Sequence, residues 1–329
     1  MATLGATGLR VSRMGLGLAA LGRPGYITVG HADDLAGGVD LFAMETGAHR
    51  VLDAASDAGV RYFDAARSYG RAEEFLASWL TARAIPPTEV TVGSKWGYTY
   101  SAGWRVDAAT HEVKDHTLPV FLRQLAESRS TLGEQLDLYQ IHSATLESGV
   151  LDDASVIDAL ARAREQGLRI GASVSGPRQA DAIWRALDIR RDGERVFDTV
   201  QATWNLLERS AGPALAAAHE EGVGVIVKEA VANGRLTSRG LWTVGGLRAE
   251  SIDRAASSVG ASIDALALAW VLAQPWVDVV LSGATTVAQL ESNLSAQRVV
   301  VSSDVSAQLD AVVMEPEQYW RERSALPWN

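Results

Sequence analysis

The apolar positions of this chain follow two alternating periods. Short apolar runs are separated by longer segments in which apolar residues recur every three or four positions, as on one face of a helix. The short runs predict eight strands, at residues 14–17, 60–64, 90–95, 136–142, 169–173, 199–203, 223–228 and 277–282. One predicted helical stripe consists of Leu118, Phe121, Leu122, Leu125 and Leu132. Four helical segments end next to a glycine, where a left-handed residue commonly caps a helix: Gly59, Gly133, Gly167 and Gly222.

Eight strands joined by helical crossovers predict an α/β protein of the closed (β/α)8 or TIM barrel type. An open doubly wound sheet is the alternative, although no Gly-x-Gly-x-x-Gly opens the first helix. Residues 3–12 predict a β-hairpin that turns at 6–8 and covers the barrel floor. Long connections at 19–45, 96–116 and 205–213 follow strand C-terminal ends, where a barrel places its active site. No repeat or linker interrupts the pattern, so we expect residues 1–329 to form a single domain.

Composition narrows the choice of partners. A formal net charge of -10, with no run of lysine or arginine, argues against binding to nucleic acid or to an anionic membrane. The absence of cysteine excludes disulfides and thiolate ligands, and the scattered histidines predict no metal site. The first residues lack a basic region followed by an apolar one. We therefore expect a soluble cytoplasmic protein; the sequence does not predict its oligomeric state.

Lysine is rare here. Only Lys95, Lys114 and Lys228 occur among 30 basic residues, and two of them close the predicted strands 90–95 and 223–228. The pKa of a lysine ammonium responds to burial and to neighbouring charges, which an arginine cannot imitate. Lys95 and Lys228 are therefore candidate functional cations, with a simple terminal position on the strand as the alternative.

Four ionisable side chains are expected to meet at one rim of the barrel. Asp64, Lys95 and His142 end the second, third and fourth strands, and Tyr69 follows Asp64 closely. We expect Asp64 to hold the Lys95 ammonium, and the ammonium to lower the pKa of the Tyr69 phenol toward that of a general acid. His142 would orient the substrate oxygen or share the proton. Because no side chain delivers hydride, such a carbonyl-protonating group implies a nicotinamide cofactor. Each residue alone also has a structural explanation, as a helix cap, a packing aromatic or a core histidine.

Several segments resemble the aldo-keto reductase superfamily, and in particular its bacterial, aldose-dehydrogenase-like branch. They are residues 64–69 (Asp-Ala-Ala-Arg-Ser-Tyr), 94–95 (Ser-Lys), 137–142 (Asp-Leu-Tyr-Gln-Ile-His), 171–173 (Gly-Ala-Ser), 201–209 and 282–293. The resemblance spans nearly the whole chain. It implies an NAD(P)(H)-dependent barrel oxidoreductase in which Tyr69 is the acid, supported by Lys95, Asp64 and His142.

The same resemblance implies a set of cofactor-binding residues: Ser173, Gln201, Lys228, Arg235, Gly283, Thr285, Gln289 and Asn293. Val174 replaces an asparagine common in the family, and Lys228 stands where most members stack an aromatic on the nicotinamide. Lys228 could meet the pyrophosphate, a substrate anion or Glu229; we expect a phosphate or the nicotinamide ribose. Gly283 and Gln289 replace basic residues, so we predict NADP(H), possibly NAD(H), with only a modest preference. Arg235 and Arg209 are the candidates for contact with a 2′-phosphate.

Aromatic residues in the rim connections predict the substrate side. Trp96, Tyr98, Trp104 and Trp204 are expected to wall a substrate pocket, and the tail residues Trp320 and Trp328 also fall in rim segments. They favour a bulky aromatic or hydrophobic carbonyl compound, with a sugar-like substrate as an alternative. Packing in the core is the competing explanation for these side chains.

The predicted function is reduction of an aldehyde or ketone to an alcohol, or the reverse. One alternative is an NAD(P)-binding regulatory subunit with little turnover, as in the potassium-channel β-subunits that share the resembled fold. The other is a barrel lyase or isomerase in which Lys95 forms a Schiff base.

Overall fold

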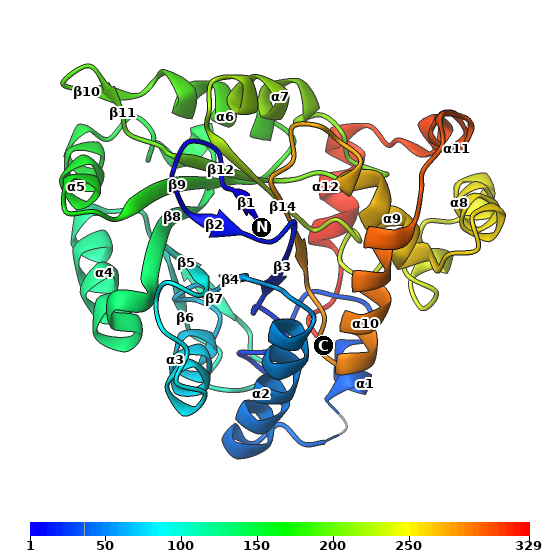
Figure 1. Cartoon of the computed structure of the whole chain (residues 1–329), viewed down its shortest axis with the longest axis horizontal. Coiled ribbons are helices and arrows are strands. Elements are labelled where there is room, and N and C mark those ends of the chain that lie inside the picture. Colours follow the sequence, from blue (N-terminus) through cyan, green and yellow to red (C-terminus); the bar gives the residue numbers. More distant parts are fainter. Residues whose placement is uncertain (36) are drawn as a thin grey trace.

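Eight parallel strands close into a barrel in the computed structural model, which describes residues 1–35 and 37–329 (Figure 1). Their order around the barrel is β12-β13-β14-β3-β4-β5-β8-β9. The strands are β3 (Met14–Gly17), β4 (Tyr62–Asp64), β5 (Thr91–Trp96), β8 (Leu136–Ala144), β9 (Arg169–Val174), β12 (Thr199–Thr203), β13 (Gly224–Lys228) and β14 (Val279–Ser282). All eight predicted strands and the closed (β/α)8 architecture are confirmed, and the open sheet is excluded.

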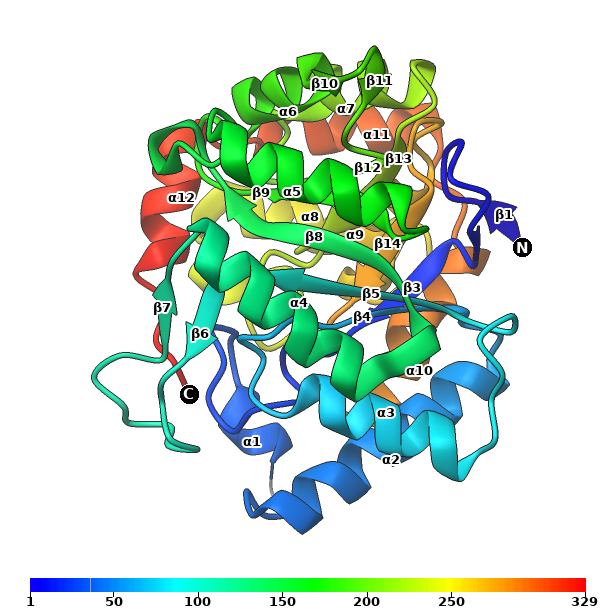
Figure 2. The ribbon, with the colours of Figure 1, turned by 90° about the vertical axis from the view of Figure 1, so that its left-hand side faces the viewer.

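Helices surround the barrel on its outside (Figures 1 and 2). The crossover helices are α2 (Leu41–Asp57), α3 (Ala72–Ala82), α4 (Leu118–Leu132), α5 (Ala154–Glu165), α6 (Gln179–Asp188), α7 (Gly212–Glu220), α9 (Ile263–Leu272) and α10 (Val287–Ser295). Additional helices are α1 (His31–Asp34), α8 (Gly246–Ser258), α11 (Ser303–Leu309) and α12 (Pro316–Ser324), with short 3-10 turns η1 (Gly133–Gln135), η2 (Leu146–Ser148), η3 (Leu241–Thr243), η4 (Ala296–Arg298) and η5 (Asp310–Val312).

Most of the apolar residues at helical spacing are buried against the barrel, as expected. In α4, Phe121, Leu125 and Leu132 are buried, but Leu122 is 54% exposed, so its assignment to the buried stripe was wrong. The four predicted capping glycines all have positive φ angles, for which glycine has no steric penalty: Gly59 (86°), Gly133 (57°), Gly167 (97°) and Gly222 (77°). Among the described residues, no single helix is long and apolar enough to cross a membrane; α8 and α9 pass that test only as a pair bent by 82°.

A β-hairpin covers the N-terminal end of the barrel, as predicted. It pairs β1 (Ala2–Thr3) with β2 (Arg10–Val11) in antiparallel register. Leu4 and Val11 are fully buried in a small cluster with side chains from inside the barrel. The Ala6 amide donates to the Gly222 carbonyl at 2.8 Å, which ties the hairpin turn to the loop before β13. A second hairpin, β10 (Arg190–Arg191) with β11 (Glu194–Arg195), precedes β12.

The long connections gather at the C-terminal end of the barrel. The segment after β5 forms a hairpin of β6 (Tyr98–Tyr100) and β7 (Glu112–Lys114), and the segment after β3 contains α1. The sequence missed a further long connection at 229–245, after β13. The tail after α12 returns to the rim, as expected for Trp328, and there the backbones of Asn329 and Tyr26 exchange hydrogen bonds of 3.1 and 3.2 Å.

Candidate active site

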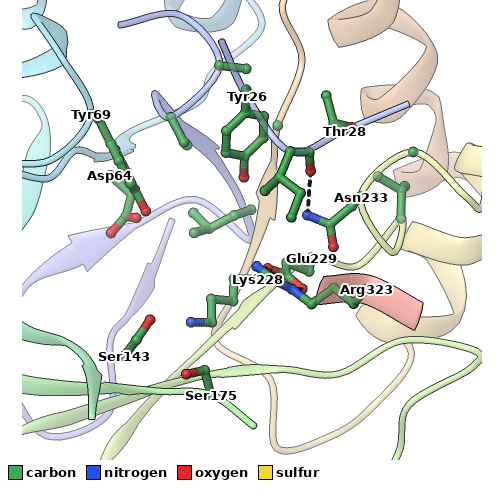
Figure 3. Close-up of a pocket in the computed structure, with 18 of the residues that line it drawn as sticks. Tyr26, Thr28, Asp64, Tyr69, Ser143, Ser175, Lys228, Glu229, Asn233 and Arg323 are labelled. Carbon is green, nitrogen blue, oxygen red and sulfur yellow. Dashed lines mark hydrogen bonds and ion pairs between the residues drawn. The ribbon is translucent and has the colours of Figure 1, made fainter. Parts of the chain in front are cut away.

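A cavity of about 350 Å³ opens among these rim segments (Figure 3). Its wall contains Asp64 and Tyr69 from the region of β4, His142 from β8, Gln201 from β12 and Lys228 from β13. Parallel strands point their C-terminal ends to one face of a barrel, so side chains far apart in the sequence meet there. The predicted convergence of the strand-end residues is therefore present.

A buried ion pair joins Asp64 to Lys95 behind this wall. The two side chains are 2% and 1% exposed, and the Lys95 ammonium also donates to the Ala65 carbonyl at 3.0 Å. The other carboxylate oxygen of Asp64 accepts from three side chains: Tyr62 Oη at 3.1 Å, Gln140 Nε2 at 3.2 Å and Gln201 Nε2 at 3.1 Å. A Schiff base requires an accessible neutral amine, so this enclosed ammonium does not suit the lyase alternative.

Tyr69 presents its hydroxyl to His142. The Oη atom lies 3.5 Å from His142 Nε2, and the Lys95 ammonium lies 4.9 Å from the centre of the phenol ring. Burial raises the pKa of Tyr69 and the Asp64 charge raises it further, while the neighbouring cation that lowers it is Arg23. The expectation that this pKa falls toward that of a general acid is therefore wrong for the free protein, because burial and the Asp64 charge outweigh the neighbouring cations. Tyr69 is held in its protonated form, which is the state that donates a proton.

His142 is held as a neutral imidazole. Burial lowers its pKa well below the usual range, and the charges of Lys95 and Lys228 lower it further. Its Nδ1 atom lies 3.4 Å from Ser68 Oγ. A neutral ring fixed at one nitrogen can orient an oxygen at the other without carrying charge.

Arg23 is a functional candidate that the sequence analysis missed. Its side chain is almost fully buried, and Nη1 donates to the Ser68 carbonyl at 3.0 Å and to Glu112 at 2.9 Å. The guanidinium lies 5.2 Å from the centre of the Tyr69 ring and 4.9 Å from that of Trp328. In a chain in which most basic residues are arginines, one more arginine in a loop gave no signal.

Lys228 extends into the cavity from the end of β13. Its ammonium donates to Ser173 Oγ at 3.0 Å, and burial lowers its pKa to about 8. Glu229 instead binds Arg323, with 3.0 Å between Nε and Oε2. In Figure 3 the Lys228 ammonium points away from Glu229 and Arg323, toward Ser143 and Ser175. Salt bridging to Glu229, one of the three alternatives for Lys228, is not formed within the described residues.

A continuous hydrogen-bond chain connects Lys228 to Lys95. Lys228 donates to Ser173, the Ser173 hydroxyl lies 3.4 Å from Gln201 Oε1, and Gln201 Nε2 donates to Asp64, which holds Lys95. The ammonium groups donate at both ends, so the direction of each bond is fixed. Ser173 and Gln201 are thus brought to the same place, as expected.

A second cavity of about 280 Å³ continues from the first. The two share Thr28, Val231, Gly234 and Gly283 in their walls. The second is also lined by three of the predicted cofactor residues: Thr285, Gln289 and Asn293. Gln289 accepts from the Thr285 amide at 2.8 Å and donates to Asp34 at 2.7 Å, and Asp34 also pairs with Arg239. We call the first cavity the reacting end and the second the distal end of one cleft.

The two arginines proposed for a 2′-phosphate lie elsewhere. Arg235 is buried with its guanidinium 4.4 Å from the centre of the Tyr319 ring, and Arg209 lies 4.1 Å above Trp270 and binds Asp310 at 2.7 Å. Both expectations are corrected: packing against aromatic rings and carboxylates of the C-terminal helices, not the cleft, holds these side chains.

Most of the predicted substrate aromatics are packing residues. Tyr98 lines the reacting end, as expected. Trp96 is fully buried against Phe121 at 5.0 Å between ring centres, and Trp204 stacks on Trp270 at 4.3 Å. Trp104 donates to the Val39 carbonyl at 2.5 Å and packs edge-on against Phe75. For these three tryptophans, the core-packing explanation is the correct one. The aromatic wall consists of Tyr98 and the tail residues Trp320 and Trp328, as expected, together with Tyr26, which the sequence analysis did not name.

The cleft suits an elongated ligand with polar groups. Asn233 Oδ1 and Arg23 Nε, both from residues that line the reacting end, are buried without a hydrogen-bond partner among the described residues. Buried acceptors and donors of this kind normally have a partner, so both atoms could bond a ligand in the cleft. Two joined cavities with polar groups along both match the shape and chemistry of a dinucleotide.

Comparison with known proteins decides the family. The sequence model of the Aldo/keto reductase family matches residues 14–314. The chain belongs to the aldo/keto reductase family. It is 25% identical to the uncharacterized oxidoreductase YrpG of Bacillus subtilis over 95% of each chain, and 28% identical to the L-galactose dehydrogenase of Arabidopsis thaliana, covering 89% of this chain and 86% of that one.

A solved structure shows the same fold. An aldo-keto reductase of Bacillus halodurans, in its holo form, superposes with a TM-score of 0.73 at 22% identity, covering 95% of this chain and 96% of the other. The resemblance seen in the sequence is confirmed. The protein is an oxidoreductase enzyme of this family.

Proposed function

We propose that this enzyme interconverts an aldehyde or ketone and the corresponding alcohol with a nicotinamide cofactor, and that Tyr69 is the general acid. The observation that carries the proposal is the position of the Tyr69 hydroxyl. It lies in the cavity 3.5 Å from a neutral His142, with the Lys95–Asp64 ion pair behind the ring. A protonated phenol and a neutral imidazole at one spot suit a carbonyl oxygen that becomes an alcohol.

The residues divide the reaction between them. When bound, the reduced cofactor supplies a hydride to the carbonyl carbon. Tyr69 gives its proton to the oxygen, and solvent then returns a proton to the phenolate. Ser68 Oγ lies 3.4 Å from Nδ1 of His142, and the proposal assigns the ring hydrogen to Nε2, so that Nδ1 accepts from Ser68 and the Nε2–H holds the same oxygen. Arg23, which lowers the pKa of Tyr69, stabilises the phenolate between the two proton transfers.

The cofactor would lie along both ends of the cleft. Ser173 and Gln201 stand at the reacting end, beside Asp64, and suit the nicotinamide carboxamide. Gly283, Thr285, Gln289 and Asn293 would hold the adenosine portion. Lys228 lies beside Ser173 at the reacting end. Arg235 is no longer proposed as a cofactor-binding residue, because its guanidinium packs on Tyr319.

The choice between NADP(H) and NAD(H) depends on the distal end. With Arg235 and Arg209 held elsewhere, the sequence-based prediction of NADP(H) loses its proposed phosphate partners. Arg239 is the cation available there, but it pairs with Asp34 and lies 3.8 Å from Asp33. A carboxylate at this place accepts a ribose 2′-hydroxyl and repels a 2′-phosphate, as in other dinucleotide sites. We propose that NAD(H) is used at least as well as NADP(H).

The substrate is proposed to be a small polyhydroxylated carbonyl compound. The reacting end combines aromatic faces with polar groups of Ser143, Ser175 and Glu112, in a volume of about 350 Å³ shared with the nicotinamide. Aromatic faces with adjacent polar groups suit a sugar, and the Arabidopsis relative is an L-galactose dehydrogenase. This choice replaces the bulky hydrophobic substrate favoured by the sequence.

A cofactor-oxidation assay tests the proposal. The purified protein is given NADH or NADPH with a panel of aldoses, short aliphatic aldehydes and aromatic aldehydes, and nicotinamide absorbance is followed. We expect turnover that disappears with Tyr69→Phe. If the protein binds NADH or NADPH but reduces no carbonyl compound in the panel, and with NAD⁺ or NADP⁺ oxidises neither the aldoses nor the corresponding alcohols, the proposal is wrong.

A further inference from the structure

The charges around the reacting end are matched in pairs, with one exception. Three carboxylates belong to this region, and each is held by its own cation: Asp64 by Lys95, Glu112 by Arg23, and Glu229 by Arg323. Lys228 is the remaining cation of the wall. Within residues 1–35 and 37–329 its ammonium forms no ion pair, and its hydrogen-bond partner is the neutral Ser173 hydroxyl.

The groups around Lys228 do not cancel its charge. Glu229 is adjacent, but both of its oxygens accept from Arg323, so this pair is close to neutral as a whole. Asp64 is likewise taken by Lys95, and His142 is neutral. Burial lowers the pKa of Lys228 to about 8; the Glu229 charge acts against this shift, and the charges of Arg323 and Lys95 act with it. A second positive charge brought into this space would meet repulsion.

The position of Lys228 along the cleft decides which part of a dinucleotide it faces. It lines the reacting end together with Tyr69 and Gln201. The junction with the distal end is made by other residues, Thr28, Val231, Gly234 and Gly283, and the central phosphates would cross there. Lys228 therefore lies at the nicotinamide portion, which must come close to Tyr69 for the reaction.

We propose that Lys228 makes this site distinguish the two redox states of the cofactor, binding the reduced form more tightly than the oxidised form. The inference rests on the proposed function. The nicotinamide ring carries a positive charge when oxidised and none when reduced, and the rest of the molecule is the same. An unmatched ammonium nearby destabilises the oxidised ring and leaves the neutral reduced ring nearly unaffected, so the dissociation constant of the oxidised cofactor should be the larger one.

The expected size follows from Coulomb's law. At an effective dielectric constant of about 20, two like charges a few ångströms apart repel enough to change a dissociation constant by more than tenfold. Lys228 is partly open to solvent, which weakens the repulsion. We therefore expect its charge to make the dissociation constant of NAD⁺ roughly tenfold larger than that of NADH.

Calorimetric titration of three ligands tests the inference. NADH, NAD⁺ and ADP-ribose, which lacks the nicotinamide, are each titrated into the wild type, Lys228→Met and Lys228→Arg. We expect Lys228→Met to tighten NAD⁺ binding relative to NADH by roughly tenfold and to leave ADP-ribose binding unchanged. Lys228→Arg keeps the charge and should retain the wild-type ratio. Unchanged ADP-ribose binding also shows that each variant is folded.

Other outcomes overturn the inference in distinguishable ways. If Lys228→Met weakens the binding of all three ligands equally, the lysine contacts a phosphate. If the ratio of the NAD⁺ and NADH affinities does not change, the lysine charge does not act on the nicotinamide ring. If the wild type binds none of these ligands, nor NADPH, the proposed function itself fails.

A pH series provides an independent check. The ammonium is charged below its pKa and neutral above it, so the excess of the NAD⁺ over the NADH dissociation constant should be largest below pH 8 and shrink as the pH rises through about 8. Lys228→Met should show no such change in that window. A ratio that stays constant through this range in the wild type contradicts the inference.

Discussion

The two ends of the cleft are built in different ways. At the reacting end the central hydrogen-bond chain comes from barrel strands, through Asp64, Ser173 and Gln201, and the pair Asp64 and Lys95 is 2% and 1% exposed. At the distal end, Asp34, Arg239 and Gln289 come from α1, a loop and α10, and the Arg239 side chain is 42% exposed. Buried polar groups are fixed by many simultaneous bonds, whereas exposed pairs are weakened by water and salt.

The difference predicts which end tolerates change. A substitution in the strand-borne network should disturb the chemistry strongly, because a buried charge loses its partner. A substitution at the distal end should adjust affinity for one cofactor over another by a modest factor. The predictions below test this contrast, from the largest expected effect to the smallest.

Tyr69→Phe should remove most of the turnover. The hydroxyl acts on the reacting oxygen, so its loss should lower kcat by about 10²–10⁴-fold while the dissociation constant of the dinucleotide stays nearly unchanged. Tyr98→Phe is a matched control, because it removes a hydroxyl from another ring of the same cavity. A Tyr69→Phe enzyme that kept more than about a third of the wild-type kcat, with chemistry rate-limiting, would show that another group is the acid.

Lys95→Arg should be nearly as damaging as the tyrosine change. The planar guanidinium is larger than an ammonium and cannot take its place against Asp64 and the Ala65 carbonyl in a fully buried site. Steady-state kinetics should show a loss in kcat, and thermal unfolding should show a lower Tm. The same change at the exposed Lys114 serves as control. Near-normal activity in Lys95→Arg would indicate that any cation suffices.

Replacing Arg23 should affect alcohol oxidation more than carbonyl reduction. Arg23 lowers the pKa of Tyr69, so Arg23→Met should raise that pKa further. Oxidation needs the phenolate, whose population at a given pH then falls; its rate should drop by roughly tenfold and its basic limb should move to higher pH. Arg23→Lys, which keeps a positive charge, should recover part of the rate. Equal pH profiles for the wild type and Arg23→Met would exclude this electrostatic role.

These residues also show what the sequence could reveal. The barrel was predictable because strands and helices leave different periods in the apolar pattern. Asp64, Lys95 and His142 were predictable because each lies at the C-terminal end of its strand or within two residues of it. Arg23 lies in an irregular segment, where no periodic pattern of apolar residues tells which way a side chain points. Aromatic side chains occur both in cores and in pocket walls, and the sequence does not distinguish the two. Trp96 and Trp204 were therefore assigned to the substrate pocket, whereas both pack in the core.

The distal end escaped prediction for a related reason. Asp34 and Gln289 are 255 positions apart, and their contact depends on the path of the connection after β3, which local sequence does not determine. The sequence identified Gln289 by resemblance but gave no reason to consider Asp34 or Arg239. Their pairing became apparent only from the folded arrangement.

Asp34→Asn should shift cofactor preference toward NADP(H) by a modest factor. The change removes the charge that neutralises Arg239 and that would repel a 2′-phosphate, while an amide can still contact Gln289. Because Arg239 is partly exposed, the gain for NADPH over NADH should be roughly three- to tenfold, measured as the ratio of their kcat/KM values.

Asp33→Asn is the matched control: its carboxylate lies farther from Arg239, at 3.8 Å, and is 83% exposed, so its effect should be smaller. If both variants keep the wild-type ratio, cofactor choice is not made by this group of side chains. If Asp34→Asn instead favours NADH, the carboxylate does not lie beside the ribose 2′-position, and the proposed orientation of the dinucleotide in the cleft must be revised.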